Sequence, residues 1–292
     1  MRVLLTGGTG FIGDPVAHAL RAAGHEVTIV SRQPGRVPAK AIAWDGLRAA
    51  MPETDAVVNL AGESVASGRW TPARKAEILT SRIEATRVIV DAIAGTATRP
   101  SVLVNASATG FYGPRGDEEL DESAAPGAGF LADVCRQWEA AASRASDLGV
   151  RVVALRLGVV LGSAGGALSR MLIPFRAGLG GPLGSGKQWM SWVHRDDVVG
   201  LVLAALAGEA CTGPVNVTAP TPVRNRDFAS ALARAVHRPA FLWTPAFALR
   251  LALGEMADAL LTGQRVIPAA AKAAGYTFKH PDLPGALAAS ID

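Results

Sequence analysis

Short apolar runs alternate with longer amphipathic stretches over about the first 165 residues of the chain. The apolar runs predict strands at residues 2–5, 26–30, 41–44, 56–59, 102–105 and 150–155. The stretches between them predict helices at residues 11–23, 71–93 and 130–148. Four of the predicted strands are nearly continuously apolar, as expected when helices cover both faces of a parallel sheet. The pattern therefore predicts an α/β fold with a doubly wound parallel sheet.

The pattern changes after Gly165, where glycine and proline become frequent. The predicted elements shorten to helices at residues 196–207, 226–236 and 247–261 and a strand at residues 215–218. Single short helices cannot bury an apolar face alone, so we expect them to pack on the sheet or on each other. We therefore expect a first domain over residues 1–165 and a smaller C-terminal α/β substrate lobe over residues 166–292, with some of the chain crossing back to the sheet.

The composition fits a globular chain with a large core, since 49% of the 292 residues are hydrophobic and 18% are charged. The net charge of +4 comes from basic residues spread singly along the chain, which predicts no nucleic-acid partner. Cys135 and Cys211 lie outside any CxxC motif, and the histidines are widely spaced, so we expect no disulfide framework and no metal site. No uncharged apolar stretch of about 18 residues occurs, which predicts a cytoplasmic protein without a membrane partner.

A glycine-rich segment, Thr6-Gly7-Gly8-Thr9-Gly10-Phe11-Ile12-Gly13, lies directly between the first predicted strand and the first predicted helix. Gly7 permits a tight turn, Gly10 lets the backbone approach a pyrophosphate, and Gly13 lets the helix lie close to the strand. The free N–H groups at the start of the helix would bind the phosphates. The segment predicts a Rossmann-type dinucleotide-binding domain whose cofactor contacts include Gly7, Thr9, Gly10, Phe11, Ile12 and Gly13.

The residues after the second predicted strand indicate which dinucleotide binds. Proteins that bind NAD(H) usually carry Asp or Glu there, whereas this chain has Ser31 and Arg32. A hydroxyl and a guanidinium suit a ribose 2′-phosphate, so we expect NADP(H) in preference to NAD(H); the alternative is that Arg32 is a solvated loop residue. After the fourth strand, the backbone of Leu60, Ala61 and Gly62 is expected beside the cofactor.

These motifs resemble the short-chain dehydrogenase/reductase superfamily, specifically its extended, epimerase-like branch of NAD(P)-dependent epimerases and dehydratases. More narrowly, the chain resembles an atypical epimerase-like family with a C-terminal extension of unknown function, here residues 240–292. The resemblance implies a small polar substrate between the first domain and the lobe, and a homodimer built from the helices at 71–93 and 130–148. The segments that carry the resemblance are residues 6–13, 59–63, 69–71, 75, 81–82, 111–113, 138–139, 155–158, 192–197 and 264–268.

The catalytic set of that superfamily is missing from this chain. The extended enzymes use a Ser or Thr four residues before a Tyr-Gly pair and a later Tyr-x-x-x-Lys, and the matching positions here hold Ala108, Leu131 and Cys135. Leucine cannot hold and release a proton, so general acid–base catalysis needs another group. The candidate replacements are Tyr112, Ser107, Lys75, Glu63 and His194, and Tyr112 could equally be a packing residue beside the nicotinamide.

Further contacts follow from the same resemblance. Arg82 stands where the extended enzymes carry an Asn near the cofactor, and an Arg can reach a pyrophosphate or ribose oxygen. Glu77 could pair with Arg82, hold a ribose hydroxyl or be an exposed helix charge, and Val160 is expected to close over the nicotinamide. The substrate candidates are Glu63, Arg69, Trp70 and His194; one of the two aspartates after His194 is predicted to cap the next helix.

Two functions fit this sequence. The first is an NADP(H)-binding, epimerase-like oxidoreductase that works without the usual Ser/Tyr/Lys set. The second is a non-catalytic NADP(H)-binding sensor or regulatory protein whose catalytic set has been lost. Polar residues remain available around the expected nicotinamide position, which favours the enzyme.

Overall fold

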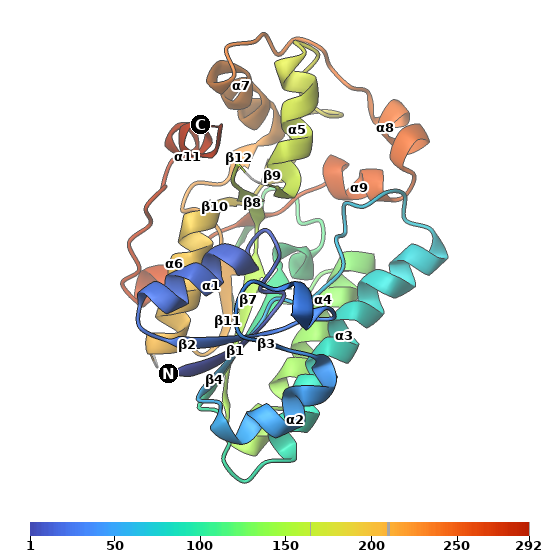
Figure 1. The fold of residues 1–292 in the computed structure, drawn as a ribbon. Coiled ribbons are helices and arrows are strands. Elements are labelled where there is room, and N and C mark those ends of the chain that lie inside the picture. Colours follow the sequence, from blue (N-terminus) through green and yellow to red (C-terminus); the bar gives the residue numbers. More distant parts are fainter. Residues whose placement is uncertain (164, 209–210, 292) are drawn as a thin grey trace.

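Seven strands form one parallel sheet in the spatial order β11-β7-β5-β4-β1-β2-β3 (Figure 1). The structure is a computed structural model that describes residues 1–163, 165–208 and 211–291. The order reverses between β1 and β4, which is the switch point at which open α/β sheets bind ligands. The predicted α/β, doubly wound Rossmann-type fold is confirmed. The strands of this sheet are β1 (Arg2–Thr6), β2 (Glu26–Val30), β3 (Ala41–Ile42), β4 (Ala56–Asn59), β5 (Val102–Ala108), β7 (Arg151–Leu157) and β11 (Gly213–Val217).

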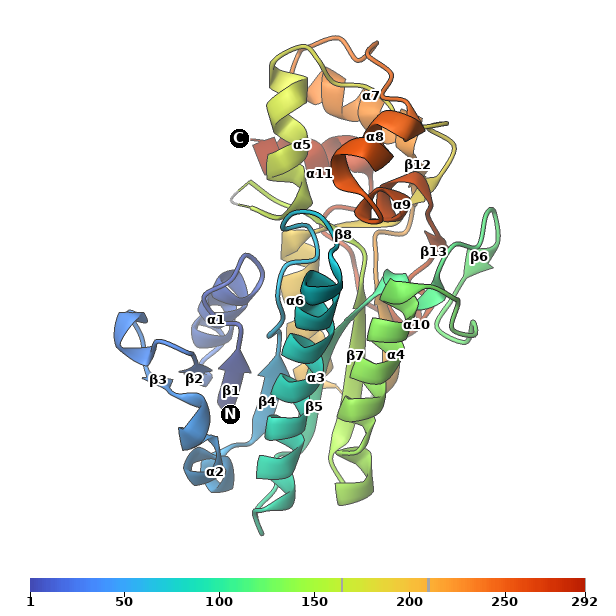
Figure 2. The same cartoon turned by 90° about the vertical axis from the view of Figure 1, so that its right-hand side faces the viewer.

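Helices cover both faces of the sheet because alternate strand residues point to opposite sides. Val3 and Leu5 belong to the core cluster formed with α1 (Gly13–Ala22) and α6 (Arg195–Ala207). Leu4 belongs to the cluster on the other face, formed with α2 (Leu47–Ala50), α3 (Pro72–Ala94) and α4 (Phe130–Ser143). In Figure 2, α3 and α4 stand side by side on this second face. The two layers leave the carboxyl ends of the strands as the open edge.

A second lobe lies above that edge and has its own core, which includes Leu161, Leu172, Trp192, Phe228 and Leu287 (Figures 1 and 2). The chain returns from this lobe to the sheet through α6 and β11. Among the described residues, no helix combines the length and hydropathy needed to cross a bilayer. The remaining elements are β8 (Val159–Leu161), α5 (Gly166–Arg176), β9 (Trp189–Met190), β10 (Trp192–His194), β12 (Val223–Arg224), α7 (Asn225–Ala235), α8 (Ala246–Leu253), α9 (Met256–Leu261), α10 (Ala269–Ala273) and α11 (Leu283–Ile291), with β6 (Glu119–Leu120) paired to β13 (Arg265–Val266).

Three predicted elements differ from the structure. The strand expected at residues 41–44 ends at Ile42, and Trp44 begins a 3₁₀ turn instead. The helix expected at 130–148 ends at Ser143 and is followed by a separate 3₁₀ turn. The helix expected at 247–261 is two helices, α8 and α9, because Gly254 adopts a φ of 62° and so interrupts the helical backbone.

Candidate cofactor site

The turn between β1 and α1 has the geometry of a pyrophosphate cradle. Gly7 has a φ of 69°, and a Cβ on it would lie 2.6 Å from the carbonyl oxygen of Leu60. A Cβ on Gly13 would lie 2.0 Å from the carbonyl oxygen of Gly7, so only glycine lets α1 pack this closely on the turn. Within the described part of the chain, no acceptor takes the N–H of Phe11 or Ile12. These N–H groups at the positive end of α1 fit a bound phosphate, as the sequence predicts.

A buried polar cluster fixes the loop that follows β4. The side chain of Asn59 accepts from Thr6 Oγ1 at 2.6 Å and donates to Thr86 Oγ1 at 3.0 Å and to Asn105 Oδ1 at 2.6 Å. Trp138 Nε1 also donates to Thr86 Oγ1. Because each buried polar atom has a partner, the cluster holds β1, β4, β5 and two helices in one register. The backbone of residues 60–62 is therefore held beside the glycine turn.

Ser31 and Arg32 lie at the carboxyl end of β2, next to that loop. The Arg32 side chain is 84% exposed and approaches Glu63 with a nitrogen–oxygen distance of 3.6 Å. Ser31 Oγ accepts the backbone N–H of Gln33. A loose, exposed ion pair contributes little to stability, so Arg32 can turn toward a phosphate without a large penalty. The structure thus brings the predicted 2′-phosphate residues together with Glu63, which the sequence placed on the substrate side.

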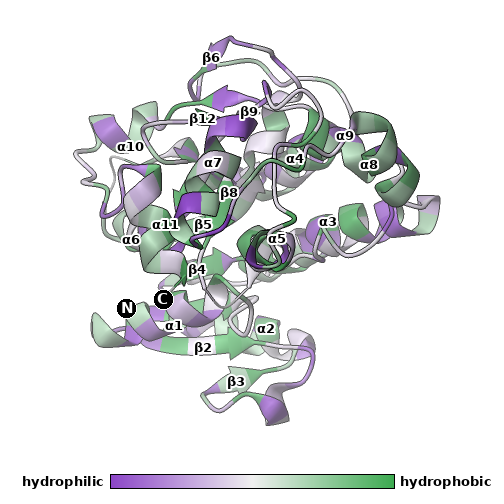
Figure 3. Cartoon of the chain, turned by 90° about the horizontal axis from the view of Figure 1, so that it is seen from above, coloured by the Kyte–Doolittle hydropathy of each residue, from purple (hydrophilic) through white to green (hydrophobic). Residues whose placement is uncertain are grey.

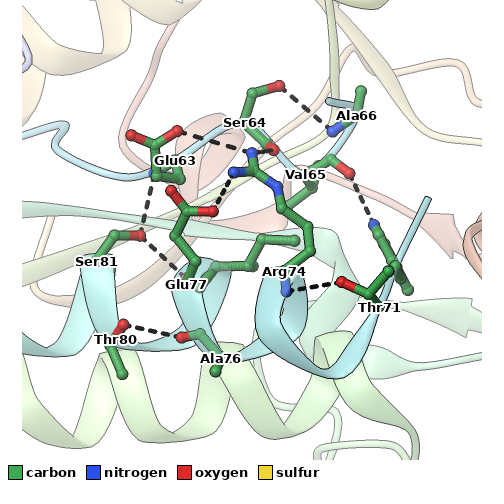
Figure 4. A network of polar contacts seen from close by, with 12 residues as sticks. Glu63, Ser64, Val65, Ala66, Thr71, Arg74, Ala76, Glu77, Thr80 and Ser81 are labelled. Carbon is green, nitrogen blue, oxygen red and sulfur yellow. Dashed lines mark hydrogen bonds and ion pairs between the residues drawn. The ribbon is translucent and has the colours of Figure 1, made fainter. Parts of the chain in front are cut away.

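Arg74 organises the segment after Gly62 and was missed in the sequence analysis (Figure 4). Its Nη1 donates to Glu77 Oε2 at 2.5 Å, and its Nη2 donates to the carbonyl oxygen of Ser64 at 2.6 Å and lies 3.7 Å from Glu63. Glu77 therefore pairs with Arg74 and not with Arg82. The i, i+3 spacing of Arg74 and Glu77 just after the Thr71-Pro72 helix start was the available signal.

Arg82 lies against the cofactor loop from the α3 side. A Cβ on Gly62 would lie 3.1 Å from Arg82 Cγ, and the guanidinium stands 5.1 Å from the Trp138 ring centroid. Burial lowers the pKa of Arg82, but the guanidinium remains charged at neutral pH. Negative charge on Cys135 or Glu63 opposes this lowering of the pKa. Arg82 thus links the cofactor loop to α4, which also carries Leu131 and Cys135.

Ala108, Leu131 and Cys135 lie close together at the carboxyl end of β5. A Cβ on Gly110 would lie 3.2 Å from Leu131 Cβ and 3.8 Å from Cys135 Sγ, so α4 presents both side chains to the turn after β5. Cys135 also contacts the backbone of Ala108 and the hydroxyl of Ser107. Burial raises the pKa of the Cys135 thiol to about 11. Ala108, Leu131 and Cys135 therefore surround one point without offering a group that exchanges a proton readily near neutral pH.

Two of the replacement candidates are engaged in the core. Tyr112 is buried; its hydroxyl donates to Asn216 Oδ1 at 2.7 Å and accepts from Arg156 Nη1 at 2.9 Å. Burial raises the pKa of its hydroxyl. Ser107 is also buried and donates to Glu139 Oε1 at 2.6 Å. These contacts favour the packing role that the sequence left open for Tyr112.

Two substrate candidates, Arg69 and Trp70, lie just before α3, and together with the catalytic candidate Lys75 they gather where α3, α4 and the C-terminal lobe meet. Lys75 Nζ lies 2.7 Å from Glu255 Oε1 and 4.8 Å from the Phe130 ring centroid. Trp70 packs edge-on against Phe130, with ring centroids 5.2 Å apart. Arg69 lies beside Gly254. Because Phe130 precedes Leu131, this junction adjoins the part of α4 that carries Leu131 and Cys135. Val160 lies half-buried in β8, near the same edge.

His194 lies elsewhere, at the start of α6, where the C-terminal segment contacts this helix. It caps α6 itself, since its Nδ1 accepts the N–H of Asp196 at 3.2 Å, and so the prediction of an aspartate cap is wrong. Its ring lies 3.8 Å from that of His280, which the sequence places far away, and its pKa is lowered by burial and by His280. Asp197 accepts the N–H groups of Lys279 and His280, and these two hydrogen bonds fix the C-terminal segment to α6.

His194, Asp196 and His280 each offer one possible metal-ligand atom, and these three atoms lie within 4.8 Å of one another. Such a group could hold a metal ion. The Nδ1 lone pair of His194 is, however, already used by the backbone of α6. The helix cap explains why His194 lies close to Asp196, and the expectation of no metal site stays a prediction.

We expect both cysteines to be unreactive toward thiol reagents. Cys135 and Cys211 are buried, and burial raises the pKa of both thiols. At pH 8, a pKa of about 11 leaves roughly one Cys135 thiol in a thousand ionised, and the thiolate is the reactive form. The folded protein should release little chromophore from Ellman's reagent until denaturant is added. A rapid reaction of one thiol per native chain would contradict this assignment.

Comparison with protein-family models matches residues 3–217 to the NAD dependent epimerase/dehydratase family and residues 244–290 to a domain of unknown function, DUF1731. The epimerase family protein SDR39U1 of Mus musculus is 43% identical over 293 residues, covering 98% of both chains. The epimerase family protein MT2273 of Mycobacterium tuberculosis is 45% identical, covering 98% of this chain and 96% of its own. The crystal structure of human SDR39U1 (isoform 2) with NADPH superposes with a TM-score of 0.92 at 40% identity, covering 99% of both chains.

Proposed function

Because the chain belongs to the NAD dependent epimerase/dehydratase family, we propose that it binds NADP(H) and acts as an epimerase-like oxidoreductase of atypical mechanism. The cradle formed by Gly7, Gly10 and Gly13 carries the first part of this proposal. A side chain at Gly7 or Gly13 would collide with backbone, which indicates that this turn is built for close approach. The similar human protein was crystallised with NADPH, which supports the choice of dinucleotide.

Arg32 supports NADP(H) over NAD(H). It stands at the end of β2, where the ribose 2′ position of a bound dinucleotide lies, and its exposed guanidinium is free to form charge-assisted hydrogen bonds with a phosphate. Glu63 is 3.6 Å away, and because this exposed pair is loose it leaves Arg32 free to turn toward that phosphate.

We expect Arg32→Ala to weaken NADPH binding by about 10–100-fold and to leave NADH binding unchanged, because a hydrogen bond to a charged group contributes about 1.5–3 kcal/mol. Calorimetric titration of both cofactors measures the two affinities. Arg48→Ala, at an exposed position in α2, is the control and should leave both unchanged. Equal affinity of the unaltered protein for NADPH and NADH would rule out the role of Arg32.

The reaction needs a proton as well as a hydride. NADP(H) supplies or accepts the hydride when bound. Cys135 is a poor proton donor because burial raises the pKa of its thiol. Arg82 keeps its charge, so it can stabilise negative charge on a substrate oxygen but cannot exchange a proton efficiently. Lys75 could donate a proton only after leaving Glu255. We propose that the proton comes from Lys75 or from water at the junction of α3 and α4, where a small polar substrate would lie.

The replacement of the catalytic set supports a second candidate, a non-catalytic NADP(H) sensor or regulatory protein. A screen of carbonyl compounds and nucleotide sugars, followed by the nicotinamide absorbance, separates the two functions. Turnover of any substrate favours the oxidoreductase. Tight NADPH binding without turnover favours the sensor. The homodimer through α3 and α4 and the cytoplasmic location stay predictions.

A further inference from the structure

Glu63 follows the cofactor loop of residues 60–62, and its carboxylate lies on the β2 side of the site. Glu63 Oε1 is 3.6 Å from Nη1 of Arg32, which follows β2. In the sheet, β2 lies next to β1, whereas β5, which ends at Ala108, lies on the other side of β4. A dinucleotide bound across the switch point between β1 and β4 has its adenosine ribose at the end of β2. Glu63 therefore lies at the adenosine end of the expected cofactor and not at the substrate end.

The end of β2 thus has beside it both kinds of group that distinguish NAD(H) from NADP(H). A carboxylate in this place accepts a hydrogen bond from the ribose 2′-hydroxyl of NAD(H), and a guanidinium binds the 2′-phosphate of NADP(H). Here the guanidinium belongs to Arg32, after β2, and the carboxylate belongs to Glu63, from the segment after β4. A Glu63 carboxylate without a fixed counterion would repel the 2′-phosphate and favour NAD(H).

Arg74 is the fixed counterion of Glu63 (Figure 4). Its Nη2 lies 3.7 Å from Glu63 Oε2 and donates to the carbonyl oxygen of Ser64 at 2.6 Å, while its Nη1 donates to Glu77. The Arg74 side chain is only 16% exposed, whereas that of Arg32 is 84% exposed. Two hydrogen bonds and partial burial therefore hold Arg74 beside Glu63, and Arg32 remains free to move to a phosphate.

The backbone at Glu63 is attached to α3 on both sides of the residue. The N–H of Glu63 donates to Ser81 Oγ at 3.1 Å, and the next carbonyl oxygen, that of Ser64, accepts from Arg74. In Figure 3, α3 shows hydrophilic residues in purple beside hydrophobic ones in green, as expected for a helix that packs one face on the core and exposes the other. These contacts keep the Glu63 side chain near the end of β2, so its charge acts on the ribose group that binds there.

We propose that Arg74, by neutralising Glu63, sets the preference of this site for NADP(H) over NAD(H). With Arg74 in place, Arg32 turns from Glu63 to the 2′-phosphate. Without Arg74, the Glu63 carboxylate repels that phosphate and accepts a hydrogen bond from the 2′-hydroxyl of NAD(H). Arg74 is therefore a positioning residue that acts through Glu63. This inference rests on the proposed binding of NADP(H) with its adenosine ribose beside Arg32.

Calorimetric titration of the full chain with NADPH and NADH tests this role, and the ratio of the NADH to the NADPH dissociation constant measures the cofactor preference. We expect Arg74→Met to lower the preference about 3–10-fold, because the Glu63 carboxylate then repels the 2′-phosphate. Glu63→Gln should raise the preference by a similar factor. In the protein that already carries Glu63→Gln, Arg74→Met should change the preference by less than about twofold. Arg74→Lys keeps the positive charge and should retain the preference.

The same helix offers matched controls. Arg87 and Glu84 form an exposed ion pair of 2.9 Å on α3, and Arg87→Met and Glu84→Gln should leave the preference unchanged. Adenosine 2′,5′-bisphosphate and adenosine 5′-monophosphate carry the adenosine end alone, so their affinities should show the same changes as those of NADPH and NADH. Added salt should reduce the difference between Arg74→Met and the unaltered protein, because it screens the repulsion between Glu63 and the phosphate. A purely structural effect of Arg74 on the loop would not depend on salt in this way.

Three results would overturn the proposal. The first is an unchanged preference in both Arg74→Met and Glu63→Gln while NADPH still binds, which would leave the proposed cofactor binding intact. The second is an equal loss of NADPH and NADH affinity in Arg74→Met that Glu63→Gln does not reverse, which would limit Arg74 to holding the backbone of Ser64. The third is no binding of NADPH by the unaltered protein, which would contradict the proposed function together with this inference.

Discussion

Replacing Gly13 by alanine is expected to abolish NADPH binding. The added Cβ would lie 2.0 Å from the carbonyl oxygen of Gly7, 2.7 Å from its carbonyl carbon and 2.8 Å from Gly8 Cα. All three are backbone atoms, which cannot move aside as a flexible side chain can. The start of α1 must therefore shift away from β1, and the N–H groups of Phe11 and Ile12 move with it. Calorimetric titration with NADPH should show no measurable binding.

Gly10→Ala tests the same cradle with less risk to folding. A Cβ at position 10 meets only the carbonyl oxygen of Gly7 within the described chain, at 3.2 Å, so the fold should be kept. The methyl group would instead occupy space into which the pyrophosphate fits, and we expect binding to weaken by about 10–100-fold, which corresponds to about 1.4–2.8 kcal/mol. Gly46→Ala is the control, since its Cβ makes only an ordinary contact of 3.6 Å with Ile42. Unchanged NADPH affinity in the folded Gly10→Ala protein would place the cofactor elsewhere.

The sheet and the glycine turn could be predicted from the sequence because their signals are local. Apolar runs mark β1, β2, β4 and β5, and the spacing of Gly7, Gly10 and Gly13 lies within one turn. The absence of the usual catalytic set stays a prediction, because Leu131 and Cys135 are placed by their distance to Trp138 and Glu139 in the resemblance; the structure does show these residues on one helix, α4. These parts of the site depend on residues that are neighbours in the chain.

The rest of the site depends on contacts between distant segments. Nothing near Lys75 in the sequence indicates that Glu255 neutralises it, and nothing near His194 indicates that His280 lies against it. Such pairs form only when the C-terminal segment crosses back over the sheet. Likewise, an apolar α8 is predicted to be buried by its composition, and only the packing of the lobe shows that Phe247 and Leu251 remain exposed.

Breaking the ion pair of Arg156 and Glu139 is expected to cause the largest loss of stability. Arg156 Nε and Nη2 donate to the two oxygens of Glu139, each at 2.9 Å, and the two side chains are only 5% and 16% exposed. The guanidinium also donates to the Tyr112 hydroxyl at 2.9 Å and stands 3.5 Å from the Phe111 ring centroid. Tyr112 donates in turn to Asn216, whose Nδ2 donates to the carbonyl oxygen of Ile267.

This chain of contacts connects β7 and α4 to β11 and to the segment after β13. Arg156→Met keeps a similar stem but leaves the Glu139 carboxylate largely buried without its cation, which costs about 3–5 kcal/mol of unfolding free energy. Equilibrium unfolding in urea measures that loss, and thermal unfolding should show a lower melting temperature. Arg136→Met removes an exposed ion pair with Asp133 and is the control, with an expected change within about 0.5 kcal/mol.

A double variant separates the ion pair from the loss of packing around Arg156. When Glu139→Gln is added to Arg156→Met, no unpaired charge remains in the core, so the double variant should be more stable than Arg156→Met alone. Equal or lower stability of the double variant would mean that the contacts of Arg156 with Tyr112 and Phe111, and not the charge pair, hold this region together. Either variant that stays folded should still bind NADPH, because the cradle at Gly7, Gly10 and Gly13 lies on β1 and α1 and shares none of these contacts.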